Sequence, residues 1–205
     1  TVLQYGRSLS WNLAIKEIFP TYSECDKLGV QFENGVVTVP EVLRKPHQLL
    51  VDGEWGALTE NPEYGGQGLP HSIAQAAMEY LTGANYILTT YPILGHGAGK
   101  MIDLFGTDLQ KKLFLKKLYT GVWGGTMLLT EPGAGSDLAS LQTKCEDKGD
   151  HYSVNGQKVW TSGAQYADWI YTLVRTEPQA PKHEGISFVL IDMAQPGVTV
   201  KPILL

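Results

Sequence analysis

The stretch LTEPGAGSDL, residues 129–138, carries residue types suited to bind a phosphate or a polar ring edge. Gly133 and Gly135 leave backbone N–H groups accessible, and the hydroxyls of Thr130 and Ser136 add donors to the same turn. A third glycine and a following helix are missing, which argues against a Rossmann loop, and the absence of Gly-Lys-Ser/Thr argues against a P-loop. Two interpretations stay open: a ligand-binding turn and an ordinary turn between strands.

Two carboxylates in this stretch, Glu131 and Asp137, have the residue type of a catalytic acid–base pair. Short acidic side chains in turns more often accept hydrogen bonds from nearby backbone groups. We therefore expect both to cap the turn locally rather than to act in catalysis.

The composition is that of a globular protein with a sizeable core, because 43% of the 205 residues are hydrophobic and 18% are charged. A formal net charge of −5 argues against a dedicated nucleic-acid binder, which is normally basic. No apolar run approaches the roughly 20 residues that cross a bilayer, and no signal peptide is recognisable. The first residue is not Met, so we expect the chain to begin inside a longer protein.

The two cysteines, Cys25 and Cys145, lie far apart in the sequence. A disulfide is one alternative, but we expect two idle or buried thiols in a reducing compartment, which favours a cytoplasmic protein. The five histidines have no partner at metal-ligand spacing, so we predict no zinc site.

Helical patterns fill the chain before residue 121. The best segment is TDLQKKLFLKKLYTG, capped by Thr107 and ended by a left-handed Gly121, with apolar residues on one face. Three further helices are predicted: residues 11–22 ending against Pro20, residues 40–53 ending near Gly53, and residues 73–88 capped by Ser72.

Strand patterns with a period of two follow residue 121. The predicted strands lie in residues 123–130, 140–147, 167–176, 185–192 and 197–205, and HYSVNGQKVW predicts a hairpin that turns at Asn155-Gly156. Both faces of residues 167–176 are apolar, so we expect burial on both sides. The Pro-rich residues 176–185 are expected to form a mobile loop.

These patterns predict an α+β protein: an all-α N-terminal domain, residues 1–121, followed by an antiparallel β-barrel or sandwich domain, residues 122–205. Short antiparallel strands with turns at this rhythm also weaken the Rossmann interpretation of the opening stretch.

Three segments resemble the acyl-CoA dehydrogenase family. The longest, residues 127–176, has T-E-P, then G-S-D, then N-G-Q-K followed by an aromatic and a hydroxyl residue, as in the middle β-domain of that family. NPEYGGQGLP and FGTDLQKKLFLKKLYTGVWGGTMLLTEP resemble its N-terminal helical domain and the run into the middle domain. TTYPILGHGAG and VWGGT look most like the long-form branch, which includes 3-methylmercaptopropionyl-CoA dehydrogenase.

The resemblance implies a cytoplasmic flavoprotein of fatty acid metabolism that removes hydrogen across the α,β bond of an acyl-CoA. The expected cofactor is FAD, the expected acceptor is an electron-transfer flavoprotein, and a homo-oligomer is expected. A carboxylate takes the α-proton while a hydride leaves the β-carbon for flavin N5; the protein orients and polarises the cofactor.

The resemblance also assigns roles to individual residues. Thr130 is expected at the pyrimidine side of the flavin with Leu129 beside the ring, and Ser136 at the FAD pyrophosphate near the thioester substrate. Trp160 is expected against the flavin and Ser162 near N5, where relatives often have Thr. The full set of expected cofactor contacts is Leu129, Thr130, Gly135, Ser136, Trp160, Thr161 and Ser162.

Simpler interpretations stand beside several of these roles. Without the motif, Thr130 would be interpreted as an ordinary strand-end residue, and Trp160 has the alternative of a core aromatic. His96, in a segment that relatives place near the substrate, is expected to be a satisfied structural histidine, with a place in the acyl pocket as the alternative. Tyr64 is a candidate for the pocket mouth without a catalytic role.

The family's C-terminal helical bundle, with its catalytic glutamate, has no counterpart in these 205 residues. We therefore expect no catalytic residue in this chain, little activity and weak FAD affinity from it alone, and an apolar face that favours association. The alternatives are an acyl-CoA oxidase, a DNA-associated binding protein of the same superfold, and a flavin-free interaction module.

Overall fold

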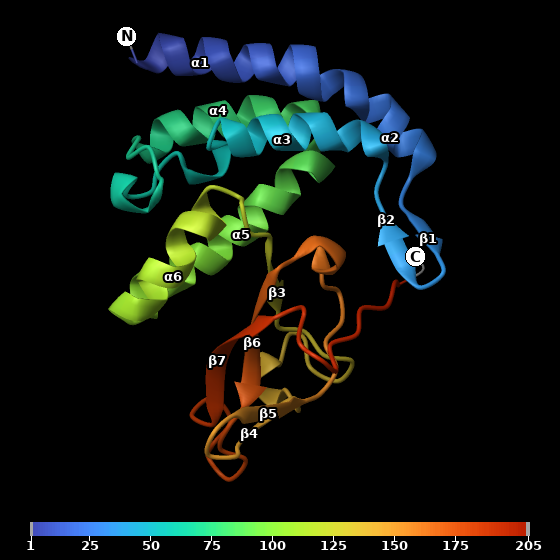
Figure 1. Cartoon of the computed structure of the whole chain (residues 1–205), viewed down its shortest axis with the longest axis vertical. Helices are drawn as coiled ribbons and strands as arrows, with labels where there is room; N and C mark the ends of the chain where they lie inside the picture. The colour runs from blue at the N-terminus through green and yellow to red at the C-terminus, as the bar shows by residue number, and fades with distance from the viewer. Residues whose placement is uncertain (1, 204–205) are drawn as a thin grey trace. The chain divides into compact units, whose positions relative to one another are not determined.

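The structure is a computed structural model that describes the backbone of residues 2–203 and the side chains of residues 8–203. It divides into two compact units, Thr1–Gly124 and Gly125–Leu205. The first unit is helical apart from one hairpin and the second is built on a sheet, so the predicted fold class is confirmed (Figure 1).

The first helix does not end at Pro20. The α-helix α1 (Val2–Leu13) continues through a π-helical turn (Ala14–Ile18) and a 3₁₀ turn (Phe19–Thr21) into α2 (Tyr22–Leu28). Pro20 lies at the start of the 3₁₀ segment, where the helix changes from π to 3₁₀ geometry, and the first turn is the part of a helix that tolerates proline best. The predicted stop was therefore wrong.

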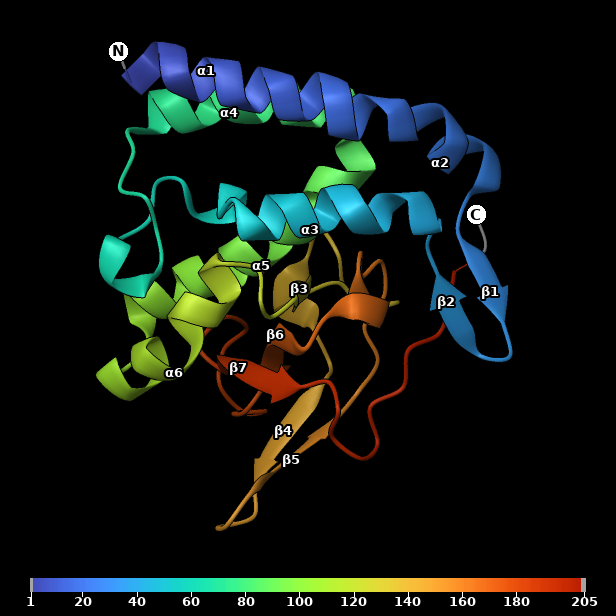
Figure 2. The same cartoon turned by 45° about the horizontal axis from the view of Figure 1, so that its top comes forward.

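Four longer helices complete the first unit: α3 (Arg44–Asp52), α4 (His71–Ala84), α5 (Tyr86–Phe105) and α6 (Asp108–Tyr119). Gly53 follows α3, as predicted. The Ser72 cap was wrong, because α4 begins at His71 after Pro70, and Asn85 with a φ of −161° splits the predicted segment into α4 and α5. Figures 1 and 2 both show α1 lying along α4.

Helix α6 has the predicted start and end. Thr107 and Gln110 form a reciprocal capping box, and Gly121 has a φ of +76°. Its buried face does not include all the apolar residues of the segment. Leu115, Leu118 and Tyr119 are buried, whereas Leu109 and Leu113 are 66% and 53% exposed.

A short hairpin interrupts the first unit, which is therefore not all-α. Strands β1 (Gln31–Glu33) and β2 (Val36–Thr38) pair antiparallel around Asn34 and Gly35, whose φ values are +51° and +83°. Two successive positive φ values are those of a tight hairpin turn, for which Asn-Gly is the favoured pair.

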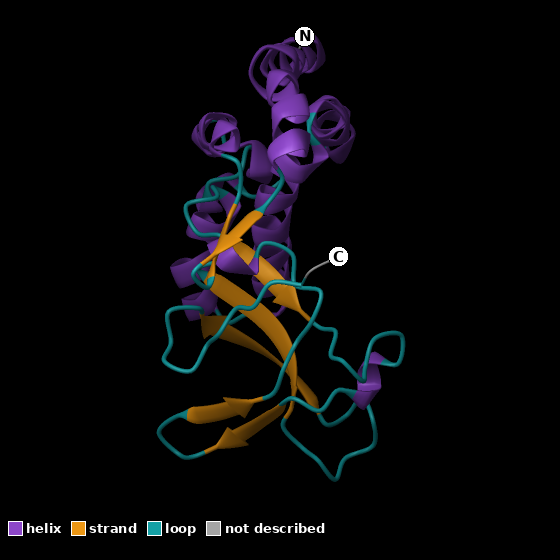
Figure 3. Ribbon diagram, turned by 90° about the vertical axis from the view of Figure 1, so that its right-hand side faces the viewer, coloured by secondary structure: helices purple, strands orange, loops and turns teal. Residues whose placement is uncertain are grey.

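The second unit holds one mixed sheet with β6 (Trp169–Arg175) at its centre (Figure 3). Its other strands are β3 (Gly125–Leu128), β4 (Lys144–Asp147), β5 (Tyr152–Asn155) and β7 (Ile186–Asp192). Strands β3 and β4 run parallel to β6, while β7 runs antiparallel to it along its whole length. No residue of β6 is exposed, which agrees with burial on both faces.

Two strand predictions for this unit were wrong. The β4–β5 hairpin turns at residues 148–151, where Gly149 has a φ of +94°, and residues 156–161 form no strand. Within the described part of residues 197–205, which ends at residue 203, no strand forms. Residues 176–185 form a loop, as predicted.

Both cysteines, Cys25 and Cys145, are free and buried, as expected. Over residues 2–203 no helix combines the length and apolar character needed to cross a membrane. Among the side chains of residues 8–203, no group of three or more His, Cys, Asp or Glu is arranged to hold a metal ion.

Candidate functional site

The predicted contact residues lie on three segments of the second unit that come together. Leu129 and Thr130 follow β3, and a hydrogen bond of 2.9 Å from the Val159 N–H to the Thr130 carbonyl lays the 158–162 segment beside them. A side chain added at Gly135 would lie 3.7 Å from the Thr130 methyl group, so the glycine turn reaches the same place. The seven residues predicted from the sequence thus belong to one local region.

The turn itself is closed by its own backbone. The N–H of Glu131 donates to the Ala134 carbonyl at 2.8 Å, and the N–H of Ala134 donates back to the Glu131 carbonyl at 3.1 Å. Gly135 and Ser136 follow this turn and are exposed. The side of the turn that carries Ser136 is therefore accessible.

Glu131 is a structural anchor of the turn. It is buried, and its carboxylate accepts hydrogen bonds from the N–H of Gln142 at 2.6 Å, the N–H and hydroxyl of Thr143, and the ammonium of Lys158. Burial alone raises the pKa of the carboxyl, but the bonds from Lys158, Thr143 and the backbone outweigh it and lower the pKa to about 2. These partners lie 11 to 27 residues along the chain from Glu131, so the expected capping within the turn was wrong, and the carboxylate instead joins the turn to distant segments.

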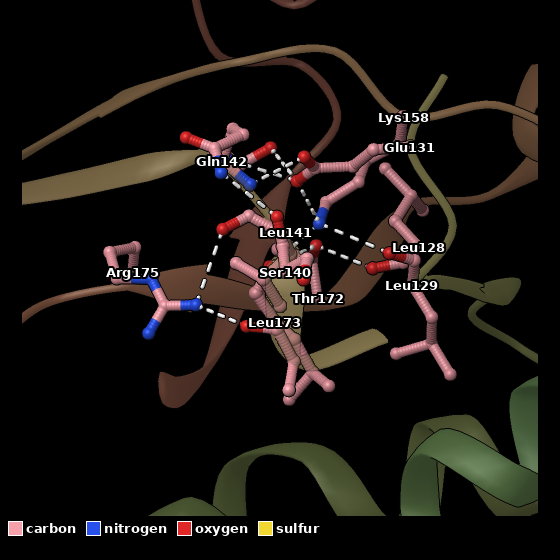
Figure 4. Close-up of polar contacts among 12 residues, drawn as sticks. Leu128, Leu129, Glu131, Ser140, Leu141, Gln142, Lys158, Thr172, Leu173 and Arg175 are labelled. Atoms are coloured by element: carbon pink, nitrogen blue, oxygen red, sulfur yellow. Dashed lines mark hydrogen bonds and ion pairs between the residues drawn. The ribbon is translucent and has the colours of Figure 1, made fainter. Parts of the chain in front are cut away.

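Lys158 links the segment at residues 129–131 to the segment at residues 158–162. Its side chain is 6% exposed, and its Nζ donates to Glu131 Oε1 at 2.8 Å, the Leu129 carbonyl at 3.3 Å and the Leu173 carbonyl at 2.8 Å. Figure 4 shows Lys158 and Glu131 directed toward one another, with dashed lines from Lys158 to the backbone beside Leu129. An ammonium has three protons, and this one uses all of them.

Two buried threonines fasten the same region to the sheet. The hydroxyl of Thr172 donates to the Leu128 carbonyl at 2.6 Å, as drawn in Figure 4. The hydroxyl of Thr126 donates to the Ser162 carbonyl at 2.6 Å. The end of β3 is therefore held by a side chain as well as by the strand ladder, and the end of the 160–162 segment is held by the side chain of Thr126.

The donors expected to meet a ligand remain unused by the protein. Among the described residues, the hydroxyls of Thr130, Ser136, Thr161 and Ser162 have no hydrogen-bond partner. By contrast, the hydroxyls of Thr126, Thr143 and Thr172 around them are all engaged. The chemistry of this donor set fits a ligand with ring carbonyl, ring nitrogen and phosphate acceptors, which is what FAD presents.

Trp160 has an unusual backbone conformation. Its φ is +61°, a left-handed value that costs a non-glycine residue about 1–2 kcal/mol, and it is 64% exposed. It is therefore not the core aromatic of the simpler interpretation. A strained backbone that presents an aromatic ring to the surface is a feature often found at ligand sites.

Gly156 is needed for close packing rather than for a turn. A Cβ at this position would lie 2.3 Å from the Thr143 hydroxyl oxygen and 2.7 Å from the Thr143 Cα. The backbone at Gly156 thus passes directly over the residue that holds Glu131, which corrects its predicted role as a hairpin turn.

Asp137 makes a local hydrogen bond within its own turn, as expected from the sequence. Its carboxylate accepts from the Ser140 hydroxyl and, at 3.2 Å, from Lys182. The bond from Ser140 and then that from Lys182 lower the pKa of this exposed carboxyl. Neither acidic residue of the opening stretch has the raised pKa that would keep a proton available for transfer.

A separate ionic cluster lies in the helical unit. The carboxylate of Glu60, 2% exposed, accepts from Lys100 at 2.9 Å and pairs with His96 Nε2 at 2.8 Å. Burial raises the pKa of Glu60, but hydrogen bonds from Lys100, His96 and Thr59 outweigh it and lower the pKa to about 2. His96 is the satisfied histidine that was expected, while Tyr64 lies half-buried in the following loop.

Sequence reasoning missed the residues that support the site. No role was predicted for Lys158 in the N-G-Q-K motif, nor for the three threonines whose hydroxyls support the site, Thr126, Thr143 and Thr172. One signal was available for Lys158, which lies in a strand-like run next to apolar residues. A lysine in such a run is a candidate for burial, and a buried lysine is normally paired with an opposite charge. The threonine contacts span 36 to 44 residues for Thr126 and Thr172 and have no local signal.

Comparison with known proteins agrees with this architecture. Residues 12–122 match the family described as acyl-CoA dehydrogenase, N-terminal domain, and residues 126–204 match acyl-CoA dehydrogenase, middle domain. The chain therefore belongs to the acyl-CoA dehydrogenase family.

Individual relatives fit the same assignment. The chain is 33% identical over 179 residues to 3-methylmercaptopropionyl-CoA dehydrogenase of Ruegeria pomeroyi, covering 85% of this chain and 30% of that protein. It is 48% identical over 107 residues to acyl-CoA dehydrogenase FadE29 of Mycobacterium tuberculosis, covering 52% of this chain and 28% of that protein.

A solved structure, acyl-CoA dehydrogenase from Geobacillus kaustophilus, superposes with a TM-score of 0.80 at 29% identity, covering 96% of this chain and 49% of that one. The chain thus spans about half of this solved chain and less than a third of the two curated relatives. The C-terminal helical domain of the family is not part of these 205 residues.

Proposed function

We propose that this chain forms the FAD-contacting and part of the acyl-CoA-contacting region of an acyl-CoA dehydrogenase. The reaction oxidises the α,β bond of an acyl-CoA thioester by abstraction of the α-proton and transfer of a hydride to flavin N5. FAD, when bound, supplies the electron-accepting ring. The observation that carries the proposal is the gathering of seven predicted contact residues whose four hydroxyls are left unpaired by the protein.

Each residue has a proposed part in holding FAD. Thr130 donates to the pyrimidine edge while Leu129 packs beside the ring. Trp160 lies against the ring, and its exposed, strained position supports this role. Hydrogen bonds at the pyrimidine edge and near N5 favour negative charge that develops on the ring during hydride transfer.

The remaining contacts involve small residues. Ser162, with Thr161 beside it, places a hydroxyl near N5. Ser136 binds the pyrophosphate and lies close to the thioester, and Gly135 lets the backbone approach the phosphates without a side chain in the way.

We further propose that the base that takes the α-proton lies outside these 205 residues. Both acidic residues of the glycine turn are committed to other partners: Glu131 is bound by four donors, and Asp137 by Ser140 and Lys182. A carboxylate fixed in this way is a poor proton acceptor, because its pKa is already lowered.

The remaining parts of the proposal follow from family membership. The chain comprises a helical domain, residues 1–121, and a β-domain, residues 122–205. The reduced flavin passes its electrons to an electron-transfer flavoprotein, and the whole protein assembles into a homo-oligomer.

The proposed contacts can be tested by FAD binding to the whole protein. Thr130→Val and Ser162→Ala each remove one hydroxyl, and each is expected to raise the Kd for FAD roughly tenfold, since one hydrogen bond to the ring is lost. Ser153→Ala, a serine on β5 away from the glycine turn, is the matched control and should leave the Kd unchanged. Wild-type protein that retains no flavin after purification and reconstitution would contradict the proposal.

A further inference from the structure

The pair formed by Glu131 and Lys158 is the most enclosed ionic contact of the second unit's described part. The carboxylate and ammonium side chains are 5% and 6% exposed, and Oε1 and Nζ are 2.8 Å apart. Removing two charges from water is costly, and replacement by well-packed apolar side chains is often neutral or stabilising. Stability alone is therefore a weak reason for such a pair at this place.

The positions of Glu131 and Lys158 along the chain indicate what the pair does. Glu131 directly follows Thr130, and Lys158 lies two residues before Trp160. One charge belongs to each of the two segments that carry the proposed flavin contacts. The bond between the charges is therefore also a bond between the segments.

Each member of the pair is tied to a further part of the sheet. Lys158 also donates to the carbonyl of Leu173 in β6, and Glu131 also accepts from the two residues that precede β4, Gln142 and Thr143. Every proton of the ammonium is used, and the carboxylate accepts four bonds. A fully satisfied network of this kind permits one arrangement of the two segments, whereas an apolar contact would tolerate sliding.

We propose that Glu131 and Lys158 are positioning residues for the flavin: together they fix the register of the 129–130 segment against the 160–162 segment, and their opposite charges cancel beside the ring. This inference rests on the proposed function, because it concerns the same cofactor. It goes beyond that function by giving a role to two residues that do not themselves touch the flavin.

Charge cancellation has a measurable signature. Glu131→Gln keeps the shape of the side chain but leaves the Lys158 ammonium uncompensated, which favours negative charge on the reduced ring and shifts the reduction potential of the bound flavin to a more positive value. Lys158→Met leaves the Glu131 carboxylate uncompensated and shifts the potential to a more negative value. A general loosening of the structure would not produce shifts of opposite sign.

The experiment measures the reduction potential and the Kd for FAD of the whole protein at about pH 8, so that the carboxylate stays ionised. We expect opposite shifts in potential from the two single variants and a Kd raised about tenfold or more in each. In the double variant Glu131→Gln/Lys158→Met, the potential returns toward the wild-type value while FAD binding stays weakened, because the register is still unfixed.

Three further variants keep the test interpretable. Thr143→Val removes one bond to the Glu131 carboxylate without removing a charge, and it should weaken FAD binding with little change in potential even if a charge variant folds poorly. Glu146→Gln and Lys148→Met disrupt an exposed ion pair of 2.7 Å on and after β4, and they should change neither quantity.

The outcomes separate this inference from the proposed function. Wild-type protein that does not bind FAD contradicts the proposed function. If the wild-type protein binds FAD, then unchanged potentials, or shifts of the same sign in both single variants, overturn the positioning role while leaving the proposed function intact.

Discussion

Trp160 combines two features that folding alone does not favour, a left-handed backbone and an exposed aromatic ring. Trp160→Gly removes the ring and relieves the backbone. The apo protein's free energy of unfolding should stay within about 1 kcal/mol of wild type, because strain relief offsets the greater flexibility of the unfolded chain. The Kd for FAD should rise roughly tenfold or more, because stacking of an aromatic on a flat ring contributes about 1–3 kcal/mol.

The matched variant is Trp160→Phe, which keeps an aromatic ring and the backbone strain and should retain most of the FAD affinity. Equal affinity in the glycine variant and the wild type would remove Trp160 from the site.

Gly156 gives a prediction about packing at a single residue. In Gly156→Ala the new methyl group would meet the Thr143 side chain and Cα at 2.3–2.7 Å, so the backbone must shift. We expect a loss of about 1–3 kcal/mol in the free energy of unfolding, the usual range for overpacking. Gly133→Ala, where no atom lies within 4 Å of the new Cβ, is the control and should change stability little. Similar effects of both variants in urea titrations would show that the close approach is unimportant.

The loop that follows Glu60 depends on an ionic tie to helix α5. Glu60 precedes the Asn61–Gly68 loop in the chain, and its carboxylate is held by His96 and Lys100 of α5. Glu60→Gln leaves the Lys100 ammonium without its buried partner, and we expect a loss of about 3 kcal/mol in the free energy of unfolding.

Limited proteolysis should in addition cleave the Glu60→Gln variant faster within this loop, because the tie to α5 is weakened. Glu41→Gln disrupts an exposed pair with Arg44 and serves as the control, with no measurable change expected. A cleavage rate in Glu60→Gln equal to that of the control would argue that other contacts hold the loop.

Most elements of the fold could be predicted from local sequence, and the errors have physical causes. The Thr107 cap of α6 and the apolar run of β6 are local patterns and were predicted correctly. The sequence contains two Asn-Gly pairs, and the predicted hairpin turn was placed at the wrong one. Asn34-Gly35 makes a tight turn, whereas at Asn155-Gly156 close contact with Thr143 sets the backbone conformation. Tertiary packing thus overrode a turn signal that is only a local preference.

The residues of the candidate site also fall into two groups, those with a local sequence signal and those without one. The residues proposed to contact the ligand follow a recognisable order of motifs, so they could be proposed from the sequence alone. The residues that hold them, Lys158, Thr126 and Thr172, act through contacts 15 to 44 residues away along the chain. Such contacts depend on which strands become neighbours, and here the parallel pairing of β3 with β6 was not anticipated.

At the scale of the whole molecule, each unit contains one buried carboxylate with a strongly lowered pKa. The pKa values of Glu60 and Glu131 are about 2 in the folded protein, against an ordinary value of 4.5. On acidification the unfolded chain takes up these protons first. The stabilisation is therefore complete above about pH 4.5 and is lost as the pH falls toward 2, by roughly 3 kcal/mol for each group.

This prediction is checked by measuring the free energy of unfolding in urea from about pH 7 down to the acid range. Stability should fall steeply below the ordinary carboxyl pKa, and Glu60→Gln and Glu131→Gln should each flatten the fall. A stability that does not change across this range would mean that the two carboxylates are not preferentially ionised in the folded state.

Family membership, a glycine turn with unpaired donors and an exposed strained tryptophan all support the proposal that the whole protein oxidises acyl-CoA thioesters with bound FAD. The most direct measurement is anaerobic titration of the FAD-loaded whole protein with a panel of acyl-CoAs, following the flavin absorbance. At least one acyl-CoA is expected to bleach the flavin, with the enoyl-CoA as product. Full flavin occupancy with no bleaching by any acyl-CoA in the panel would contradict the claim.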